Sequence, residues 1–188
     1  VVVQEYNGEG KPYSEDEEKI LSTISNQIAL SIQRKRYSDA LAESEKNYRT
    51  IFNTAPVGIF QSNTDGQIVT VNNSFINILG YDNSEEMLNL KMEELYFNKN
   101  DRKQLVKRLM KNKSIVDNEL EWKKKNGEKI WIELSAYVMK SYDGTSEHFE
   151  GFIKDVTQRK HDEELILQLS SGIEQSPTSV IITDLDGN

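Results

Sequence analysis

The sequence predicts an α+β fold: a five-stranded antiparallel sheet with helices packed on one face, flanked by long linker helices. Three observations predict it. Two strand-like runs joined by an Asp-Gly turn come first, a stretch with helical spacing follows, and three further strand-like runs come last. Long helical stretches without proline precede and follow this pattern.

The composition suits a soluble globular protein with solvated helices, since 36% of the 188 residues are hydrophobic and 29% are charged. The formal net charge of −8 argues against a nucleic-acid partner, because a phosphate backbone would be repelled. No apolar run is long enough to cross a bilayer and no signal peptide opens the chain, so we expect no membrane insertion and a cytoplasmic location. The absence of cysteine excludes disulfides, thiolate nucleophiles and cysteine zinc sites.

The N-terminal segment predicts a strand followed by a long helix. Residues 1–6 are rich in β-forming residues and end at an Asn-Gly break. Ser14 and Glu17 form a capping box at the start of the helix, and four consecutive acids place negative charge on its positive end. No proline or glycine interrupts residues 14–53, so we expect one long helix or two helices in line.

Two sets of residues along this helix indicate what it packs against. The first set is apolar and recurs at helical spacing; it comprises Ile20, Leu21, Ile24, Ile28 and Ile32. The second set alternates steps of four and three residues like a coiled-coil seam, although Arg34 and Ser44 weaken it. Its members are Leu30, Arg34, Tyr37, Leu41, Ser44, Tyr48 and Ile51. A coiled coil with a second copy of the chain and a helix packed on its own domain both remain open.

The central region begins with a predicted hairpin. Strand-like residues 57–62 and 67–71 flank a turn at Asp65-Gly66. Residues 72–79 then return to helical spacing, and the glycine that follows them is a natural C-cap.

Two more helices are predicted before the next strands. Asn83 and Glu86 cap a short helix that runs through Leu88. Residues 101–111 form an amphipathic helix with lysines along one side. The residues expected to face inward are Leu105, Val106, Leu109 and Met110, and the lysines are Lys103, Lys107 and Lys111.

Three strand-like runs complete the predicted sheet, at residues 115–125, 128–140 and 147–156. They are joined by an Asn-Gly turn and by a turn near an Asp-Gly pair, so they form a meander. After Thr157 the sequence becomes charged and helical through Leu169.

The end of the chain repeats an earlier segment. Without gaps, residues 51–67 align with residues 172–188, so that Pro56 meets Pro177 and Gly66 meets Gly187. An apolar helix end, a proline, a short strand and an Asp-Gly turn recur in one register. We therefore expect a second copy of the domain to begin near residue 169.

Four motifs of the central region resemble those of the PAS domain, a small sensory module of signalling proteins, with its C-terminal motif. They are APVGIFQSNTDGQIVTVN, NNSFINILGY, ELEWKKKNGEKIW and GFIKDVTQRK, in this order. The N-terminal strand and helix resemble the end of a GAF domain, a related sensory fold. The resemblance implies a GAF-like end at 1–36, a helical linker at 37–47, a PAS domain at 48–160, an exit helix at 161–171 and the truncated start of a second PAS domain at 172–188.

By this resemblance the chain is a sensory and relay module of a multi-domain signal-transduction protein. A ligand or an upstream domain would shift the sheet between two states, and helices paired across a homodimer would carry the change to an effector. The implied partners are therefore a second copy and the adjacent sensory and effector domains of the same chain. We expect a histidine kinase effector, with a cyclic-dinucleotide enzyme as the alternative. A spacer domain that only dimerises and binds no ligand also remains open.

We predict no catalytic residues and no metal site in this segment. His161-Asp162 is similar to the acceptor pair of histidine kinases, but the following residues depart from that motif and favour a solvated helix face. His148 and Glu150 share one face of a strand, yet two such residues are more typical of a polar surface than of a metal site. The sequence also has no glycine-rich phosphate loop.

The resemblance also bears on cofactors. Flavin photosensors of the family attach their flavin through a cysteine, and haem-binding members use a histidine on the helix before the third strand. This chain has no cysteine, and residues 101–113 contain no histidine, so we expect neither cofactor. Two alternatives remain for the space between the sheet and the helices: it binds a small organic ligand, or it is a fully packed core without a ligand. The candidate pocket lining is Ile59, Phe75, Leu79, Tyr81, Leu95, Leu109, Leu120, Ile132, Leu134 and Ile153.

Asp155 and Thr157 lie where the last predicted strand meets the exit helix, and Thr157 is a candidate N-cap. They match the Asp-x-Thr motif of the family, which implies that they couple the sheet to the orientation of the helix. Two lysine clusters, one on the amphipathic helix and one at residues 123–125, have the charge to attract a phosphate. In an acidic protein we expect both to be solvated faces.

Overall fold

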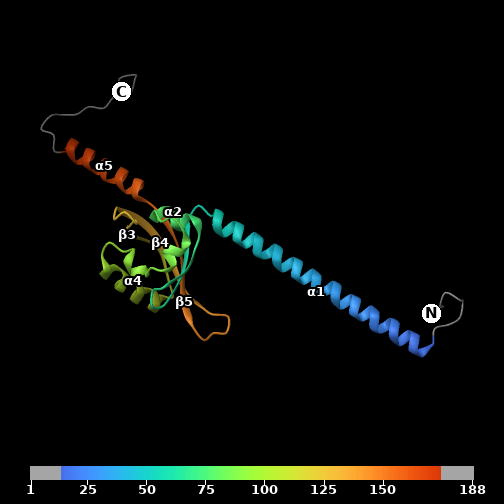
Figure 1. The fold of residues 1–188 in the computed structure, drawn as a ribbon. Helices are drawn as coiled ribbons and strands as arrows, with labels where there is room; N and C mark the ends of the chain where they lie inside the picture. Colours follow the sequence, from blue (N-terminus) through green and yellow to red (C-terminus); the bar gives the residue numbers. More distant parts are fainter. Residues whose placement is uncertain (1–13, 175–188) are drawn as a thin grey trace, which may run out of the picture. The chain divides into compact units, whose positions relative to one another are not determined.

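A computed structural model describes residues 14–174 of the protein (Figure 1). The strand expected at residues 1–6 and the repeated strand and turn near the C-terminus lie outside the described residues. The chain divides into two compact units, Val1–Ile51 and Phe52–Asn188.

The first unit contains most of α1 (Glu15–Thr54), which is one uninterrupted helix of 40 residues, the first of the two alternatives that the sequence left open. The capping box is confirmed, because the backbone N–H of Glu17 donates to Ser14 Oγ at 3.4 Å and Ser14 N–H donates to the Glu17 carboxylate at 2.9 Å. The hydrogen bonds that the Ser14 N–H and hydroxyl donate to the carboxylate lower the pKa of Glu17. No residue of α1 is buried. At about 100° per residue, its two sets of apolar side chains lie on roughly opposite sides of the helix.

The second unit contains the predicted five-stranded antiparallel sheet, in the order β2-β1-β5-β4-β3. The strands are β1 (Gly58–Asn63), β2 (Ile68–Val71), β3 (Ser114–Lys123), β4 (Lys129–Lys140) and β5 (Glu147–Asp155). β3 ends two residues earlier than predicted. The reason is that the backbone N–H of Lys125 donates to the carbonyl of Leu79 instead of to the neighbouring strand.

Four short helical segments connect β2 to β3. They are α2 (Asn73–Leu79), α3 (Ser84–Leu88), the 3₁₀ helix η1 (Met92–Glu94) and α4 (Lys99–Asn112). The predicted caps are confirmed, since Gly80 adopts a φ of 71° after α2 and the Asn83 side chain accepts from Glu86 N–H before α3. α4 starts two residues earlier than predicted because the Asn98 side chain accepts from Asn100 N–H.

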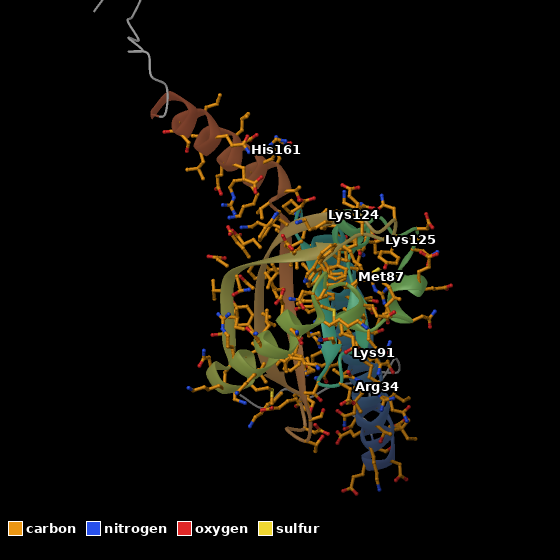
Figure 2. All side chains as sticks on the ribbon, turned by 90° about the vertical axis from the view of Figure 1, so that its left-hand side faces the viewer. Arg34, Met87, Lys91, Lys124, Lys125 and His161 are labelled. Atoms are coloured by element: carbon orange, nitrogen blue, oxygen red, sulfur yellow. The ribbon has the colours of Figure 1, made fainter. Side chains whose placement is uncertain are left out.

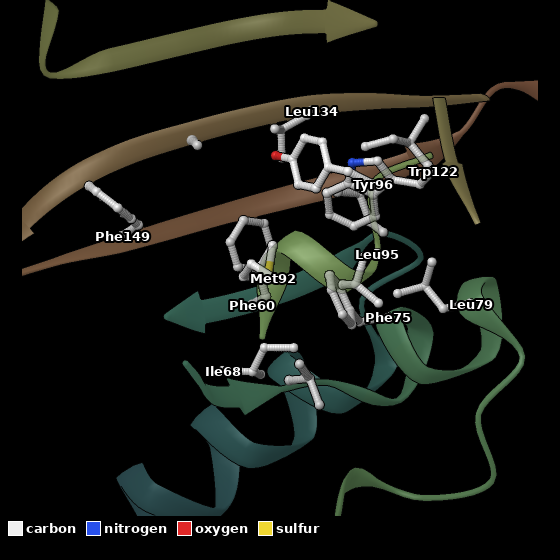
Figure 3. Close-up of a cluster of buried hydrophobic side chains, with 14 of the residues drawn as sticks. Phe60, Ile68, Phe75, Leu79, Met92, Leu95, Tyr96, Trp122, Leu134 and Phe149 are labelled. Carbon is white, nitrogen blue, oxygen red and sulfur yellow. The ribbon is translucent and has the colours of Figure 1, made fainter. Parts of the chain in front are cut away.

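The core lies between the helices and one face of the sheet, and aromatic rings fill its centre (Figure 3). The rings of Phe60 and Phe75 lie 5.5 Å apart, and Trp122 contacts Phe75 at 6.1 Å and Tyr96 at 5.2 Å between centroids. On α4, Leu105 and Leu109 are buried as predicted. The prediction that Met110 also faces inward is wrong, because this residue is 38% exposed. Its position on the helix is turned away from the two buried leucines.

Gly151 of β5 lies in a crowded position within the sheet. A Cβ on this residue would lie 2.5 Å from the carbonyl oxygen of Ser135 and 2.9 Å from the ring of Phe60. Real Cβ atoms do not come so close, so the position accepts only glycine without a shift of the backbone or the ring.

The chain leaves the sheet through α5 (Thr157–Glu174), which extends past the predicted end at Leu169 (Figure 1). Among residues 14–174, no helix is long and apolar enough to cross a membrane.

Candidate functional site

Three hydrogen bonds hold the junction between β5 and α5, and each of them is donated by a backbone N–H. The carboxylate of Asp155 accepts from Thr157 N–H at 2.9 Å, and the Thr157 hydroxyl accepts from Trp131 N–H at 3.0 Å. The N–H of Val156 donates to the carbonyl of Trp131 at 2.9 Å. Thr157 was predicted as an N-cap, and this is wrong: it is the first helical residue and its hydroxyl faces β4. Asp155 and Thr157 thus tie the first turn of α5 to two strands.

Ion pairs reinforce this junction from the face of the sheet opposite the core. Glu119 of β3 binds two consecutive cations of α5: Arg159 Nη2 lies 2.8 Å from Glu119 Oε1, and Lys160 Nζ contacts Glu119 Oε2. Both cations also reach Glu163, at 2.9 Å and 3.4 Å. Hydrogen bonds from Lys160 and then Arg159 lower the pKa of Glu119, and Glu119 in turn raises the pKa of Lys160.

Two residues of β4 complete the network. Glu133 lies 3.0 Å from Lys154 of β5 and 3.8 Å from Arg159, and Lys160 Nζ sits 5.6 Å from the centroid of the Trp131 ring. We call this set the junction network; it comprises Glu119, Trp131, Glu133, Lys154, Arg159, Lys160 and Glu163. It connects the last three strands of the sheet with the first two turns of α5.

A bulge in β3 places Glu119 in this network. In a regular strand, residues four apart share a face, so Glu119 would point to the core with the buried Ile115. The register shifts between Ile115 and Asn118, and Asp117 adopts a φ of 49°. Beyond the bulge Glu119 pairs with Glu133 on the outer face, while Trp122 points into the core.

Asn72 performs a comparable role where the chain enters the domain. It is fully buried, and its Oδ1 accepts from Ile59 N–H at 2.8 Å and Phe75 N–H at 2.9 Å. Its Nδ2 donates to the carbonyls of Phe52 at 2.8 Å and Val57 at 2.9 Å. One side chain therefore connects the last turn of α1 with β1 and α2. The sequence analysis assigned Asn72 only to the start of a helix.

Most of the candidate pocket residues lie together in the core (Figure 3). The buried ones are Phe75, Leu79, Leu95, Leu109, Ile132, Leu134 and Ile153. Tyr81 and Leu120 are partly buried against them, whereas Ile59 is half-buried and lies outside the cluster. The predicted lining is thus a contiguous set with one exception, and whether it holds a ligand stays a prediction.

Three buried polar atoms in this unit form no hydrogen bond within the described part of the chain: Ser62 Oγ, Tyr96 Oη and Trp122 Nε1. Tyr96 and Trp122 are neighbours in the core, and burial raises the pKa of the Tyr96 hydroxyl. Buried polar groups without partners are uncommon, so this corner of the core has unused hydrogen-bonding capacity. The sequence analysis did not single out either residue.

A separate surface groove of about 530 Å³ lies beside α2. It shares no residue with the predicted lining. The groove is lined by Asn53, Val71, Asn73, Ile76, Asn77, Asp82, Asn83 and Ser84.

The two histidines differ in their exposure, since His148 is half-buried and His161 is exposed. His161 is exposed on α5, away from the sheet, where Figure 2 labels it. His148 Nε2 lies 3.1 Å from Glu150 Oε1 on β5. Among residues 14–174, no three side chains of the metal-binding types gather into a cation site.

Two of the three lysines of residues 123–125 pair with acids of the same domain, so the cluster is not an open patch of three free charges. Lys124 Nζ lies 3.1 Å from Glu128, and Lys125 Nζ contacts Asp82 and Glu86; Figure 2 labels the two lysines. Lys125 thereby holds the β3–β4 turn against the segment between α2 and α3.

Two curated proteins are similar to this chain in sequence. The chain is 28% identical over 169 residues to the sensor histidine kinase TmoS of Ectopseudomonas mendocina, covering 84% of this chain and 17% of TmoS. It is 26% identical over 136 residues to the probable diguanylate cyclase DgcE of Escherichia coli, covering 71% of this chain and 12% of DgcE. The chain therefore spans less than a fifth of the length of these relatives.

The fold has solved counterparts. The crystal structure of a PAS domain of an HTR-like protein from Haloarcula marismortui superposes with a TM-score of 0.53 at 23% identity, covering 64% of this chain and 98% of that domain. The family model described as PAS domain matches residues 56–158, which is more than half of the chain and includes β1 to β5 and the first two residues of α5. This chain belongs to the PAS domain family.

Proposed function

We propose that this chain is a sensory and relay module of a larger signalling protein, in which the state of the sheet sets the orientation of α5. The observation that carries the proposal is the junction network, because it joins strands that are far apart in the sequence to consecutive residues of the exit helix. A change in the sheet near Glu119 or Trp131 would alter several contacts of α5 at once. No catalytic residues are needed for this role.

The free energy contributed by the ion pairs of the junction network is small enough for a ligand or a neighbouring domain to rearrange them. Exposed ion pairs each contribute little, on the order of 0–1 kcal/mol, whereas a connected set contributes more. A two-state element moves from 1:99 to 99:1 for about 5.5 kcal/mol of differential binding. Contacts that are individually weak can therefore be rearranged by an ordinary ligand or by a neighbouring domain.

The two signalling relatives support an effector beyond this segment. We propose a histidine kinase as in TmoS, with a cyclic-dinucleotide enzyme as in DgcE as the alternative. We also propose that the chain works as a homodimer. The seam from Leu30 to Ile51 fits pairing with a second copy, since its members are exposed on α1.

The proposed signal is a small organic molecule in the core, and not haem or a cysteine-linked flavin. The support for this is the pair of buried polar groups, Tyr96 Oη and Trp122 Nε1, which face each other and Arg102 without a well-formed hydrogen bond and would favour a ligand carrying a hydrogen-bond acceptor in an otherwise apolar pocket. Native mass spectrometry of the purified chain tests it. A co-purified organic molecule that is lost in Trp122→Phe would support sensing, and a mass equal to the bare chain would favour the spacer alternative.

The relay itself is tested by measuring the orientation of α5. The chain has no cysteine, so spin labels at introduced Lys140→Cys and Gln168→Cys, with the labelled chain diluted in an excess of unlabelled chain, report the distance within one copy by electron paramagnetic resonance. Glu119→Ala removes the central carboxylate of the network, and we expect the distribution to broaden. Glu121→Ala is the matched control, because Glu121 is also on β3 but pairs with Lys129 of β4, at 2.9 Å.

The same pair of variants distinguishes a relay from a merely structural contact in the full-length protein. We expect Glu119→Ala to change the basal activity of the effector and Glu121→Ala to leave it unchanged. An unaltered distance distribution in Glu119→Ala would refute the role of the junction network. An altered distribution with unaltered effector output would refute the relay.

A further inference from the structure

The cations of α4 differ from those elsewhere in the domain. α4 carries six lysines and arginines and one aspartate, in a chain whose net charge is −8. Outside α4, most cations of the second unit pair with an acid: Lys113, Lys124, Lys125, Lys129, Lys154, Arg159 and Lys160. Within residues 14–174, no cation of α4 lies within 4 Å of a carboxylate.

Four of these cations form a line, which we call the lysine ridge: Lys99, Lys103, Lys107 and Lys111. All four are exposed. Successive members are four residues apart, so the ridge is about 18 Å long with a charge about every 6 Å. Like charges four residues apart destabilise a helix, so the ridge opposes the stability of α4. Part of the cost is offset near the C-terminus of the helix, where the dipole favours cations, but Lys99 lies at the unfavourable end.

The two arginines of α4 are already engaged and do not belong to the ridge. Arg102 lies 5.9 Å from the centroid of the Tyr96 ring, and Arg108 donates to Asn118 Oδ1 at 3.1 Å. Met110 lies on the same side of the helix as the ridge, and its side chain is 38% exposed. Exposed methionine is adaptable and contacts apolar side chains of many shapes. The surface therefore combines a row of positive charges with one apolar contact.

We propose that the lysine ridge and Met110 bind an acidic segment of a partner protein, with several carboxylates in line and an apolar side chain beside them. A protein segment fits better than a nucleic acid for two reasons. The net charge of −8 repels a long polyanion, whereas a short row of carboxylates meets only the local positive field. A phosphate backbone would also leave Met110 without an apolar partner. This interaction is independent of the junction network, which lies on the opposite face of the sheet.

A designed peptide tests this surface. The probe is a fluorescein-labelled helical peptide of about 16 residues, with glutamate at every fourth position and one leucine beside the row, a spacing that matches the ridge. The control peptide has the same composition with its glutamates consecutive. We expect fluorescence polarisation to show binding of the probe at low salt, weaker binding of the control peptide, and loss of affinity as salt is raised.

Variants of the chain locate the binding site. We expect Lys103→Gln with Lys107→Gln to lower the affinity about tenfold, from the loss of two surface ion pairs. The matched control is Lys123→Gln with Lys140→Gln, which removes two lysines on β3 and β4 that also form no ion pair with the acids of residues 14–174. Met110→Ser should weaken binding and leave its salt dependence unchanged.

Each other outcome overturns the proposal. No binding of the probe by the unaltered chain, equal loss in the control variant, or equal binding of the two peptides would exclude a specific acidic partner at this surface. Tighter binding of a single-stranded oligonucleotide of equal charge, or of phosphatidylserine vesicles, would show that the ridge recognises a different class of partner.

Discussion

The replacement Asn72→Asp tests whether the buried amide organises the entry to the domain. The two side chains have the same shape, so the aspartate keeps the oxygen that accepts from Ile59 and Phe75. Its second oxygen replaces the amide nitrogen and faces the carbonyls of Phe52 and Val57. An ionised carboxylate would be repelled by these two oxygens, so we expect the folded protein to keep the aspartate protonated and its pKa raised.

The size of the effect depends on pH. An unfolded aspartate has a pKa of about 3.9, and each pH unit above it costs about 1.4 kcal/mol if the folded state holds the neutral form. At pH 7.5 this amounts to up to about 4–5 kcal/mol, and at pH 4.5 to about 1 kcal/mol. A further 1 kcal/mol or so is lost at both pH values, because a carboxylic acid donates to one carbonyl and not to two. Since the folded pKa is raised, the stability of the variant is greatest at low pH and falls as pH rises.

Urea denaturation of the chain and the variant at pH 4.5 and 7.5 measures this difference. The matched control is Asn77→Asp on the exposed side of α2, for which we expect nearly equal effects at the two pH values. If Asn72→Asp destabilised the protein equally at both pH values, the amide donors would not be what secures this position, and the reasoning would be refuted.

Two further substitutions test the junction and the sheet. Thr157→Val removes the acceptor for the backbone N–H of Trp131, so it should lower the free energy of unfolding by about 1 kcal/mol and speed hydrogen exchange at Trp131. Thr157→Ser keeps the hydroxyl and should have neither effect. Equal exchange rates in the two variants would contradict the assigned hydrogen bond. Gly151→Ala should cost about 2–3 kcal/mol in urea denaturation, because the added methyl meets a backbone oxygen and an aromatic ring. Gly127→Ala, where the methyl meets nothing within 4 Å but φ is 84°, should cost about 1 kcal/mol, and equal costs would argue against crowding at Gly151.

Much of the fold was predictable because local signals and the hydrophobic pattern agree. The hairpin turns, the caps at Ser14, Gly80 and Asn83, and the alternation of buried residues along β4 all follow from neighbouring residues. Errors occurred where a distant group competes with the local pattern. The end of β3 was misplaced because Lys125 bonds to Leu79, which is 46 residues away in the numbering of the chain.

The site was harder to predict because its members meet only through the sheet register. Asp155 and Thr157 were found from a local motif, but the contact of Glu119 with Arg159 depends on the bulge at Asp117. One signal was present in the sequence. Trp122 is seven positions after Ile115, an odd step, and both residues point into the core, which requires a bulge between them.

Gly151 limits the ways in which this domain can move. A slip of β5 against β1 by one residue would turn the faces of the strand over, and a slip by two would bring Phe149 or Ile153 opposite Phe60, where only a hydrogen atom fits. The ring of Phe60 therefore opposes sliding of β5 against β1 as a response to a signal. The sheet can still twist or bend as one piece, and such a motion displaces its edges the most. β3 is one of those edges, so the largest displacement would occur on the strand that carries Glu119.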